Sequence, residues 1–131
     1  MVIKSLYDTI ARLRNASNLH FNQINVRTSI FTLNILKVLY ELGFILGFKV
    51  LNFKFTLVFL RFFNNFCSFR LLLLLSKPTR QLYVTYKQLK YFNFYKYNFN
   101  SFFLISTNYG ILTDKQCINL KIGGKLILEV F

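Results

Sequence analysis

The side chains that could take part in acid–base, nucleophilic or metal chemistry are few and scattered. The 131 residues include one histidine, His20, two cysteines, Cys67 and Cys117, and four carboxylates in all. Catalysis needs a general base, an activated nucleophile or clustered metal ligands, and the chain shows neither such a pattern nor a glycine-rich phosphate loop. The cysteine spacing fits two buried thiols better than a zinc or redox motif. We therefore expect that the chain is not an enzyme and that it binds no cofactor, metal ion or small-molecule substrate.

A different kind of chemistry is concentrated in the apolar C-terminal third, where Ile105–Asp114 reads ISTNYGILTD. The hydroxyl and amide groups of Ser106, Thr107 and Asn108 can donate and accept hydrogen bonds at short range. Gly110 lets another backbone approach without a Cβ. The segment is interpreted either as a plain turn or as a surface that contacts a ligand.

The overall charge indicates what such a ligand would be. Lysine and arginine number 17 against four acids, which gives a net charge of +13. Residues 1–75 carry +7 and residues 76–131 carry +6. This balance favours a polyanion, either a nucleic acid or an anionic membrane surface, as the partner of both parts.

A membrane partner is the weaker interpretation, although 54% of the residues are hydrophobic. A spanning helix needs roughly 18 consecutive apolar residues, and the charges at Lys49, Lys54, Arg61 and Arg70 interrupt the most apolar region. We expect no membrane span. A basic peripheral protein of an organelle membrane is the alternative function. The residues that dominate the composition can use A/T-rich codons, which suggests an organelle genome, and no secretory signal or transit peptide is evident.

Hydrophobic periodicity predicts the elements of the N-terminal part. A helix is expected over residues 3–14, with Arg12 and Arg14 closing it as a solvated end that opposes the helix dipole. A second helix, from residue 28 or 29 to 42, is expected to stop at Gly43. The predicted strands are 24–26, 44–50, 53–62 and 66–75, with a hairpin turn at Asn64-Asn65.

The segment Ser76–Arg80 contains the only proline and predicts a boundary between subdomains 1–75 and 76–131. Thr113 and Asp114 resemble a helix N-terminus, and residues 88–100 receive no assignment. The predicted fold class is α+β, with two helices and a three-stranded antiparallel sheet in the first subdomain. The second is predicted to be mostly β with one short helix, and its expected elements are strands 82–87, 102–106 and 126–131 and a helix from Thr113 to near Lys121.

These segments occur in the order found in one known family. The stretch Tyr7–Asn15 resembles the first helix of the bacterial-type small-subunit ribosomal protein eight family, and residues 38–50 resemble its second helix and following strand. Ser76–Pro78 is similar to its Ser-Arg-Pro junction. Ser106–Asp114 resembles its signature, usually Ser-Thr-Ser-x-Gly followed by apolar residues and Thr-Asp, and Gly123-Gly124 is similar to its end. The resemblance covers nearly the whole chain.

The resemblance implies a two-part α+β protein that binds the central domain of small-subunit ribosomal RNA, supports subunit assembly and contacts neighbouring ribosomal proteins. The signature implies RNA contacts by Ser106, Thr107, Asn108, Tyr109 and Gly110. Lys77, Arg80, Lys87 and Lys115 would contact phosphates, while Tyr83 is either an RNA contact or a packed strand residue. The remaining predicted RNA-binding residues are Pro78 and Thr79 at the junction and Arg12, Arg14 and Asn15 near the first helix end.

Three departures from the family pattern lie in residues 76–131. Asn108 replaces the usual serine, Thr79 replaces a glycine, and residues 88–100 lack the family's proline- and glycine-containing segment. That last segment mixes aromatic and basic residues that would pack on RNA or on a neighbouring protein. The A/T-like composition and the divergence favour a mitochondrial ribosome over a plastid one.

Overall fold

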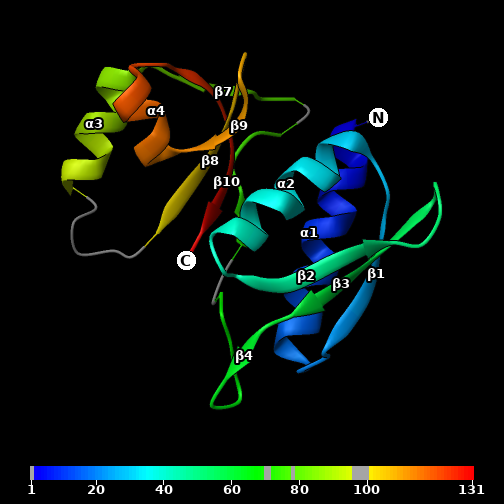
Figure 1. The fold of residues 1–131 in the computed structure, drawn as a ribbon. Helices are drawn as coiled ribbons and strands as arrows, with labels where there is room; N and C mark the ends of the chain where they lie inside the picture. The colour runs from blue at the N-terminus through cyan, green and yellow to red at the C-terminus, as the bar shows by residue number, and fades with distance from the viewer. Residues whose placement is uncertain (1, 70–71, 78, 96–100) are drawn as a thin grey trace. The chain divides into compact units, whose positions relative to one another are not determined.

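The computed structural model describes residues 2–69, 72–77, 79–95 and 101–131 of the chain. It consists of two compact units, residues 1–70 and residues 71–131 (Figure 1). Both are built from helices and antiparallel sheets, so the α+β class is confirmed. Among the described residues, no helix combines the length and the apolar character needed to cross a membrane.

The first helix of the N-terminal unit, α1 (Val2–Asn18), is longer than predicted. Residues 15–18 look polar in sequence, yet Ala16 and Ser17 are buried. The Ser17 hydroxyl donates to the carbonyl of Arg14 over 2.8 Å, which satisfies that group inside the helix. Arg12 and Arg14 therefore lie within α1 rather than closing it, and the predicted dipole role of the two arginines is wrong.

The second helix, α2 (Ile30–Glu41), has the predicted ends. Ser29 is its N-cap and accepts a hydrogen bond from the backbone N–H of Thr32, which satisfies one of the unpaired donors at a helix start. Gly43 has a φ of +82°, and the following N–H of Phe44 donates to the carbonyl of Leu39. This is the left-handed stop that the sequence predicted.

The N-terminal sheet has the strand order β1-β3-β2, all antiparallel, with β1 at Gln23–Arg27, β2 at Ile45–Val50 and β3 at Phe55–Leu60. The prediction of a single strand over 66–75 is wrong. Its first part, β5 (Phe66–Cys67), pairs with β4 (Phe62–Phe63) in a hairpin. The turn is the predicted Asn64-Asn65 pair, with φ values of 48° and 67° that asparagine tolerates well.

The remaining part of that predicted strand is β6 (Leu72–Leu74), which belongs to the C-terminal sheet. The other strands there are β7 (Leu82–Val84), β8 (Phe102–Thr107), β9 (Gly110–Thr113) and β10 (Gly124–Val130). Strand β10 pairs with β8 along one edge and with both β6 and β7 along the other. The pairing of β6 with β10 places β6 in the second compact unit, residues 71–131.

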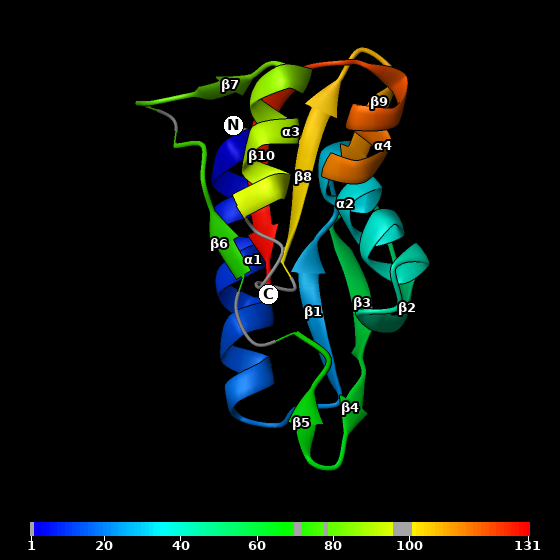
Figure 2. The same ribbon diagram turned by 90° about the vertical axis from the view of Figure 1, so that its left-hand side faces the viewer.

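Two helices, α3 (Tyr86–Tyr95) and α4 (Asp114–Leu120), lie on the same face of this sheet (Figure 2). They enclose a core of Val84, Leu89, Phe103, Ile105, Cys117 and Leu126. The prediction of one short helix missed α3. The predicted strand 82–87 ends at Val84, because Thr85 and Gln88 form reciprocal side chain to backbone hydrogen bonds that start a helix.

Candidate nucleic-acid interface

The signature segment Ser106–Gly110 forms the tight turn of a β-hairpin. Thr107 pairs with Gly110, and Asn108 and Tyr109 form the turn between β8 and β9. The Thr107 hydroxyl donates to the carbonyl of Gly110 over 2.9 Å and accepts from the N–H of Tyr109. Gly110 has a φ of +103°, a value that residues with a Cβ rarely adopt. The turn is therefore held in one shape, with Asn108 and Tyr109 exposed at its tip.

A row of polar side chains crosses the sheet beside this hairpin. Lys125 in β10 pairs directly with Ser106 in β8 on one side and with Tyr83 in β7 on the other. Directly paired residues of neighbouring strands project from the same face of a sheet. At the next position along the strands, Leu126 pairs with Leu82 and with Ile105. Leu126 and Ile105 belong to the core under α3 and α4, and Leu82 packs against it. The Tyr83–Lys125–Ser106 row therefore projects from the opposite face, and Tyr83 is 67% exposed.

The sequence did not identify Lys125 as part of the site. Its only local signal is its position directly after Gly123-Gly124, and register alone connects it to Ser106. A Cβ built on Gly124 would overlap the carbonyl oxygen of Ser106 and lie 3.0 Å from Cγ2 of Ile105. The missing side chain thus permits β10 to approach β8 closely where the row crosses.

The predicted contacts Lys77, Thr79 and Arg80 lie on a turn that is attached to β10. Ser76 is buried, and its hydroxyl donates to the carbonyl of Leu126 and accepts from the N–H of Leu82. Backbone hydrogen bonds between Lys77 and Arg80, 2.8 and 3.1 Å long, close the turn. Lys77, Thr79 and Arg80 are exposed, and Pro78 lies outside the described residues.

Two predicted phosphate contacts stand on helices. Lys87 is exposed in the first turn of α3, so its predicted place on a strand is wrong. Lys115 is exposed in the first turn of α4, and its ammonium lies 5.5 Å from the ring centroid of Phe102. Phe102 begins β8, whereas Ser106 lies four residues further along that strand. At a rise of about 3.3 Å per residue, Lys115 is not brought to the hairpin turn.

The cap of α4 holds the hairpin's second strand in place. Thr113 ends β9 and is also the N-cap of α4, and its side chain and that of Gln116 form the reciprocal bonds of a capping box. Asp114 is 3% exposed at the positive end of the helix. Both roles follow the sequence prediction, and together they link the hairpin to the helix core.

The other predicted contacts, Arg12, Arg14 and Asn15, belong to the N-terminal unit. The Arg12 guanidinium lies 3.0 Å from a carboxylate oxygen of Asp8 and donates to the carbonyl of Asn25. Arg14 is half-buried and Asn15 is exposed. These residues follow one another within α1, one to two turns before its end at Asn18.

Comparison with known proteins gives the family of the chain. Residues 4–131 match the family model described as Ribosomal protein S8. The chain belongs to the ribosomal protein S8 family. The chain is 34% identical over 125 residues to small ribosomal subunit protein uS8m of Acanthamoeba castellanii, covering 95% of this chain and 97% of that one. It is 35% identical over 130 residues to small ribosomal subunit protein uS8 of Carsonella ruddii, covering 99% of each.

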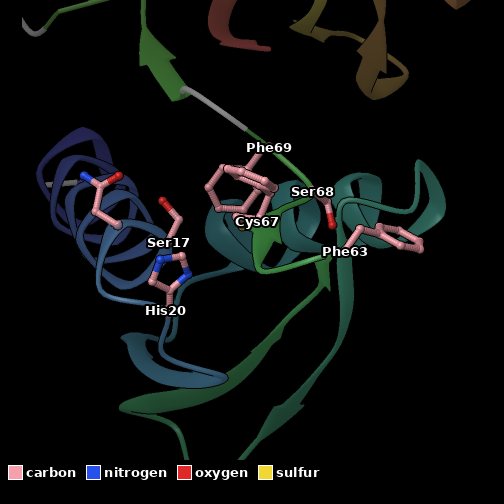
Figure 3. A pocket seen from close by; sticks show the side chains of 8 residues that line it. Ser17, His20, Phe63, Cys67, Ser68 and Phe69 are labelled. Atoms are coloured by element: carbon pink, nitrogen blue, oxygen red, sulfur yellow. The ribbon is translucent and has the colours of Figure 1, made fainter.

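One pocket of this S8-family chain contains residue types that can catalyse reactions. It has a volume of about 730 Å³, and Figure 3 shows Ser17 and His20 on one side and Cys67 and Phe69 on the other. Burial raises the pKa of the Cys67 thiol, against the weaker opposite effect of hydrogen bonds from the backbone of Phe69 and Ser68. The reactive form of cysteine is the thiolate, so this environment deactivates Cys67.

The His20 ring packs at 48° to the ring of Phe62, with 5.8 Å between their centroids. Among the described residues, no three His, Cys, Asp or Glu side chains are grouped so that they could hold a metal ion. The C-terminal sheet of this S8-family chain presents the hydroxyl groups of Tyr83 and Ser106 and the ammonium of Lys125 in one row.

Proposed function

We propose that this chain is a structural, non-enzymatic constituent of the small ribosomal subunit that binds the central domain of small-subunit ribosomal RNA. The observation that carries the proposal is the register that aligns Tyr83, Lys125 and Ser106 beside a rigid, exposed hairpin turn. The family and the relatives named small ribosomal subunit protein support it. The net charge of +13 agrees with a polyanionic partner.

The geometry suits RNA recognition by shape and hydrogen bonding. An irregular RNA helix exposes 2′-hydroxyls and base edges in a shallow minor groove. The Ser106 hydroxyl and the Asn108 amide can donate and accept there, and the small Gly110 permits close approach of the backbone. The ammonium of Lys125 and the charges of Lys77 and Arg80 would pair with phosphates, which adds affinity without choosing a sequence.

A binding experiment tests this proposal. We expect the full chain to bind a central-domain RNA fragment more tightly than an unrelated hairpin of equal length, with affinity that falls steeply as salt rises, because each neutralised phosphate releases counterions. Equal affinity for both RNAs would falsify specific recognition. The chain should also sediment with small subunits after detergent treatment, whereas release by detergent would favour the peripheral-membrane alternative.

We further propose a mitochondrial location and contacts with neighbouring small-subunit proteins. The support is the A/T-like composition together with the similarity to uS8m of Acanthamoeba castellanii, a mitochondrial member of the family. Fractionation followed by detection of the protein beside mitochondrial and plastid marker proteins tests the location. Enrichment with the plastid marker would contradict it.

A further inference from the structure

The outward side of α3 presents aromatic and polar side chains together. Lys87, Gln88, Tyr91 and Phe92 line a shallow cleft of about 400 Å³. They follow one another at positions i, i+1, i+4 and i+5, which share one side of a helix. Tyr91 is 60% and Phe92 is 42% exposed, while Leu89 on the opposite side of the helix is 1% exposed in the core. Two large rings thus stand in solvent on a helix whose other side is firmly packed.

The cleft has a defined geometry. Gln88, which lines it, also accepts a hydrogen bond from the N–H of Thr85 over 3.0 Å and so fixes the start of α3. The rings of Tyr91 and Phe92 meet edge to face, with 6.3 Å between centroids and an angle of 70°. In this arrangement at least one face of each ring points away from the other ring. A flat group can therefore stack on the exposed part of Phe92, with Tyr91 beside it.

The charge around the cleft favours an anionic partner. No acidic residue occurs in the sequence between Glu41 and Asp114, and Asp114 is 3% exposed. Lys87 and Lys90 are both exposed on α3. Exposed aromatic rings interleaved with lysines are the combination that binds single-stranded nucleic acid, because every base has a face to stack and every nucleotide brings a phosphate. A helix side that faces only solvent would have no need of the large aromatic rings of Tyr91 and Phe92.

We propose that the outward side of α3 binds an unpaired segment of ribosomal RNA, with a base stacked at the exposed Tyr91–Phe92 pair and phosphates near Lys87 and Lys90. This inference rests on the proposed function and extends it. Helix α3 covers the sheet face that carries the core, whereas the Tyr83–Lys125–Ser106 row projects from the opposite face. The α3 cleft therefore contacts a second RNA segment, distinct from the one that meets the hairpin.

Paired substitutions separate stacking from charge. The probe is the complete small-subunit ribosomal RNA, with excess unrelated RNA as competitor. We expect Tyr91→Ala with Phe92→Ala to weaken binding about 5- to 100-fold without changing its salt dependence. Lys87→Ala with Lys90→Ala should instead lower the slope of log affinity against log salt by roughly one for each lysine that meets a phosphate. Phe53→Ala is the matched control, because Phe53 is 83% exposed in the N-terminal unit.

Base-specific chemical probing identifies the RNA segment. One or more unpaired bases should be protected by the wild-type chain and by Phe53→Ala, and become reactive with the Tyr91→Ala, Phe92→Ala variant. Wild-type affinity and protection in that variant would overturn the inference, and a defect confined to subunit assembly would show that α3 docks a protein. If Ser106→Ala lowers affinity while the α3 variants do not, the inference alone fails. If neither Ser106→Ala nor the α3 variants lower the affinity, the proposed function fails as well.

Discussion

Lys125 pairs directly with Ser106 across β10 and β8, so a cation and the first hydroxyl of the signature segment stand side by side on one sheet face. In the proposed interface, the pair would combine two kinds of RNA contact in one place. The hydroxyl is suited to base edges and 2′-hydroxyls, while the ammonium is suited to phosphates. The relationship depends on Gly124, because a Cβ there would overlap the Ser106 carbonyl.

Replacing Lys125 by alanine should weaken binding to the central-domain RNA fragment by about 1.5–3 kcal/mol, the usual worth of a hydrogen bond to a charged group. The slope of log affinity against log salt should fall by roughly one. Filter binding or fluorescence anisotropy over a salt series measures both quantities. Lys37→Ala is the control, because Lys37 is exposed on α2 in the N-terminal unit. Equal effects from the two substitutions would show that Lys125 contributes only general charge.

The two hydroxyls of the signature should respond differently to substitution. Ser106→Ala should weaken specific binding by about 1 kcal/mol and leave stability unchanged, because the proposed role of Ser106 is a contact with RNA. Thr107→Ala should also loosen the turn, since the hydroxyl bonds to Gly110 and Tyr109. Thr107→Ser keeps that hydroxyl and should restore the turn. Urea unfolding measured beside RNA affinity separates the two roles, and full binding by Ser106→Ala, Thr107→Ala would exclude the hairpin as the contact.

Gly124→Ala should reduce both stability and RNA affinity. The added methyl group has no space between β10 and β8, and overpacking of this kind costs about 1–3 kcal/mol. Gly47→Ala is the matched control in β2, because a Cβ there meets no atom within 4 Å. Thermal unfolding by circular dichroism, together with RNA binding, tests the difference. Equal unfolding temperatures for the two variants would contradict the close approach.

The elements with local signals were predictable from the sequence. Ser29 and Gly43 delimit α2 through their capping chemistry, and Asn64-Asn65 marks its hairpin through tolerance of positive φ. Thr113 and Asp114 start α4 for equally local reasons. In each case the signal lies within a few residues of the feature that it determines.

The features that depend on distant pairing were not predictable. The run Leu71–Leu75 suits any buried strand, and only its pairing with Leu128 and Val130 places β6 in the C-terminal sheet. Strand β9 was hidden because Ile111 and Leu112 follow a turn-like segment, and its ladder with β8 defines it. Lys125 lies beside Ser106 only because of the register between β10 and β8, and the two residues are far apart in the sequence. The aromatic composition of α3 is typical of strands. The segment is nevertheless a helix, which starts with a capping box at Thr85 and packs Leu89 into the core.

Removing the N-cap of α4 should destabilise the C-terminal unit. Thr113→Ala removes the acceptor for the N–H of Gln116 and should lower the free energy of unfolding by about 1 kcal/mol. Thr113→Ser retains the capping oxygen and should stay close to wild type. Hydrogen exchange of amides in β9 and α4 measures the local effect. Equal protection in the alanine and serine variants would show that the cap contributes nothing to holding the hairpin.

The buried thiol of Cys117 should make stability depend on alkaline pH. Burial, and secondly the negative charge of Asp114, raise the pKa of Cys117 from 9.0 to about 11. A raised pKa means that the folded state holds the proton where the unfolded state has lost it. The resulting stabilisation is complete below pH 9 and is lost as the pH rises through about 11. The difference in unfolding free energy between wild type and Cys117→Ala should therefore be constant up to about pH 8 and shrink above it.

Urea unfolding of both proteins from pH 7 to pH 11 measures this difference. Subtracting the unfolding free energy of the variant from that of the wild type removes the contribution of lysines and tyrosines, which titrate in both proteins. Cys67→Ala is the matched control for removing a thiol, because Cys67 is only partly buried and lies in the other unit. A difference for Cys117→Ala that does not change with pH would mean that the thiol titrates alike in the folded and unfolded states. That result would contradict the close packing of α4 on the sheet that presents Ser106 and Lys125.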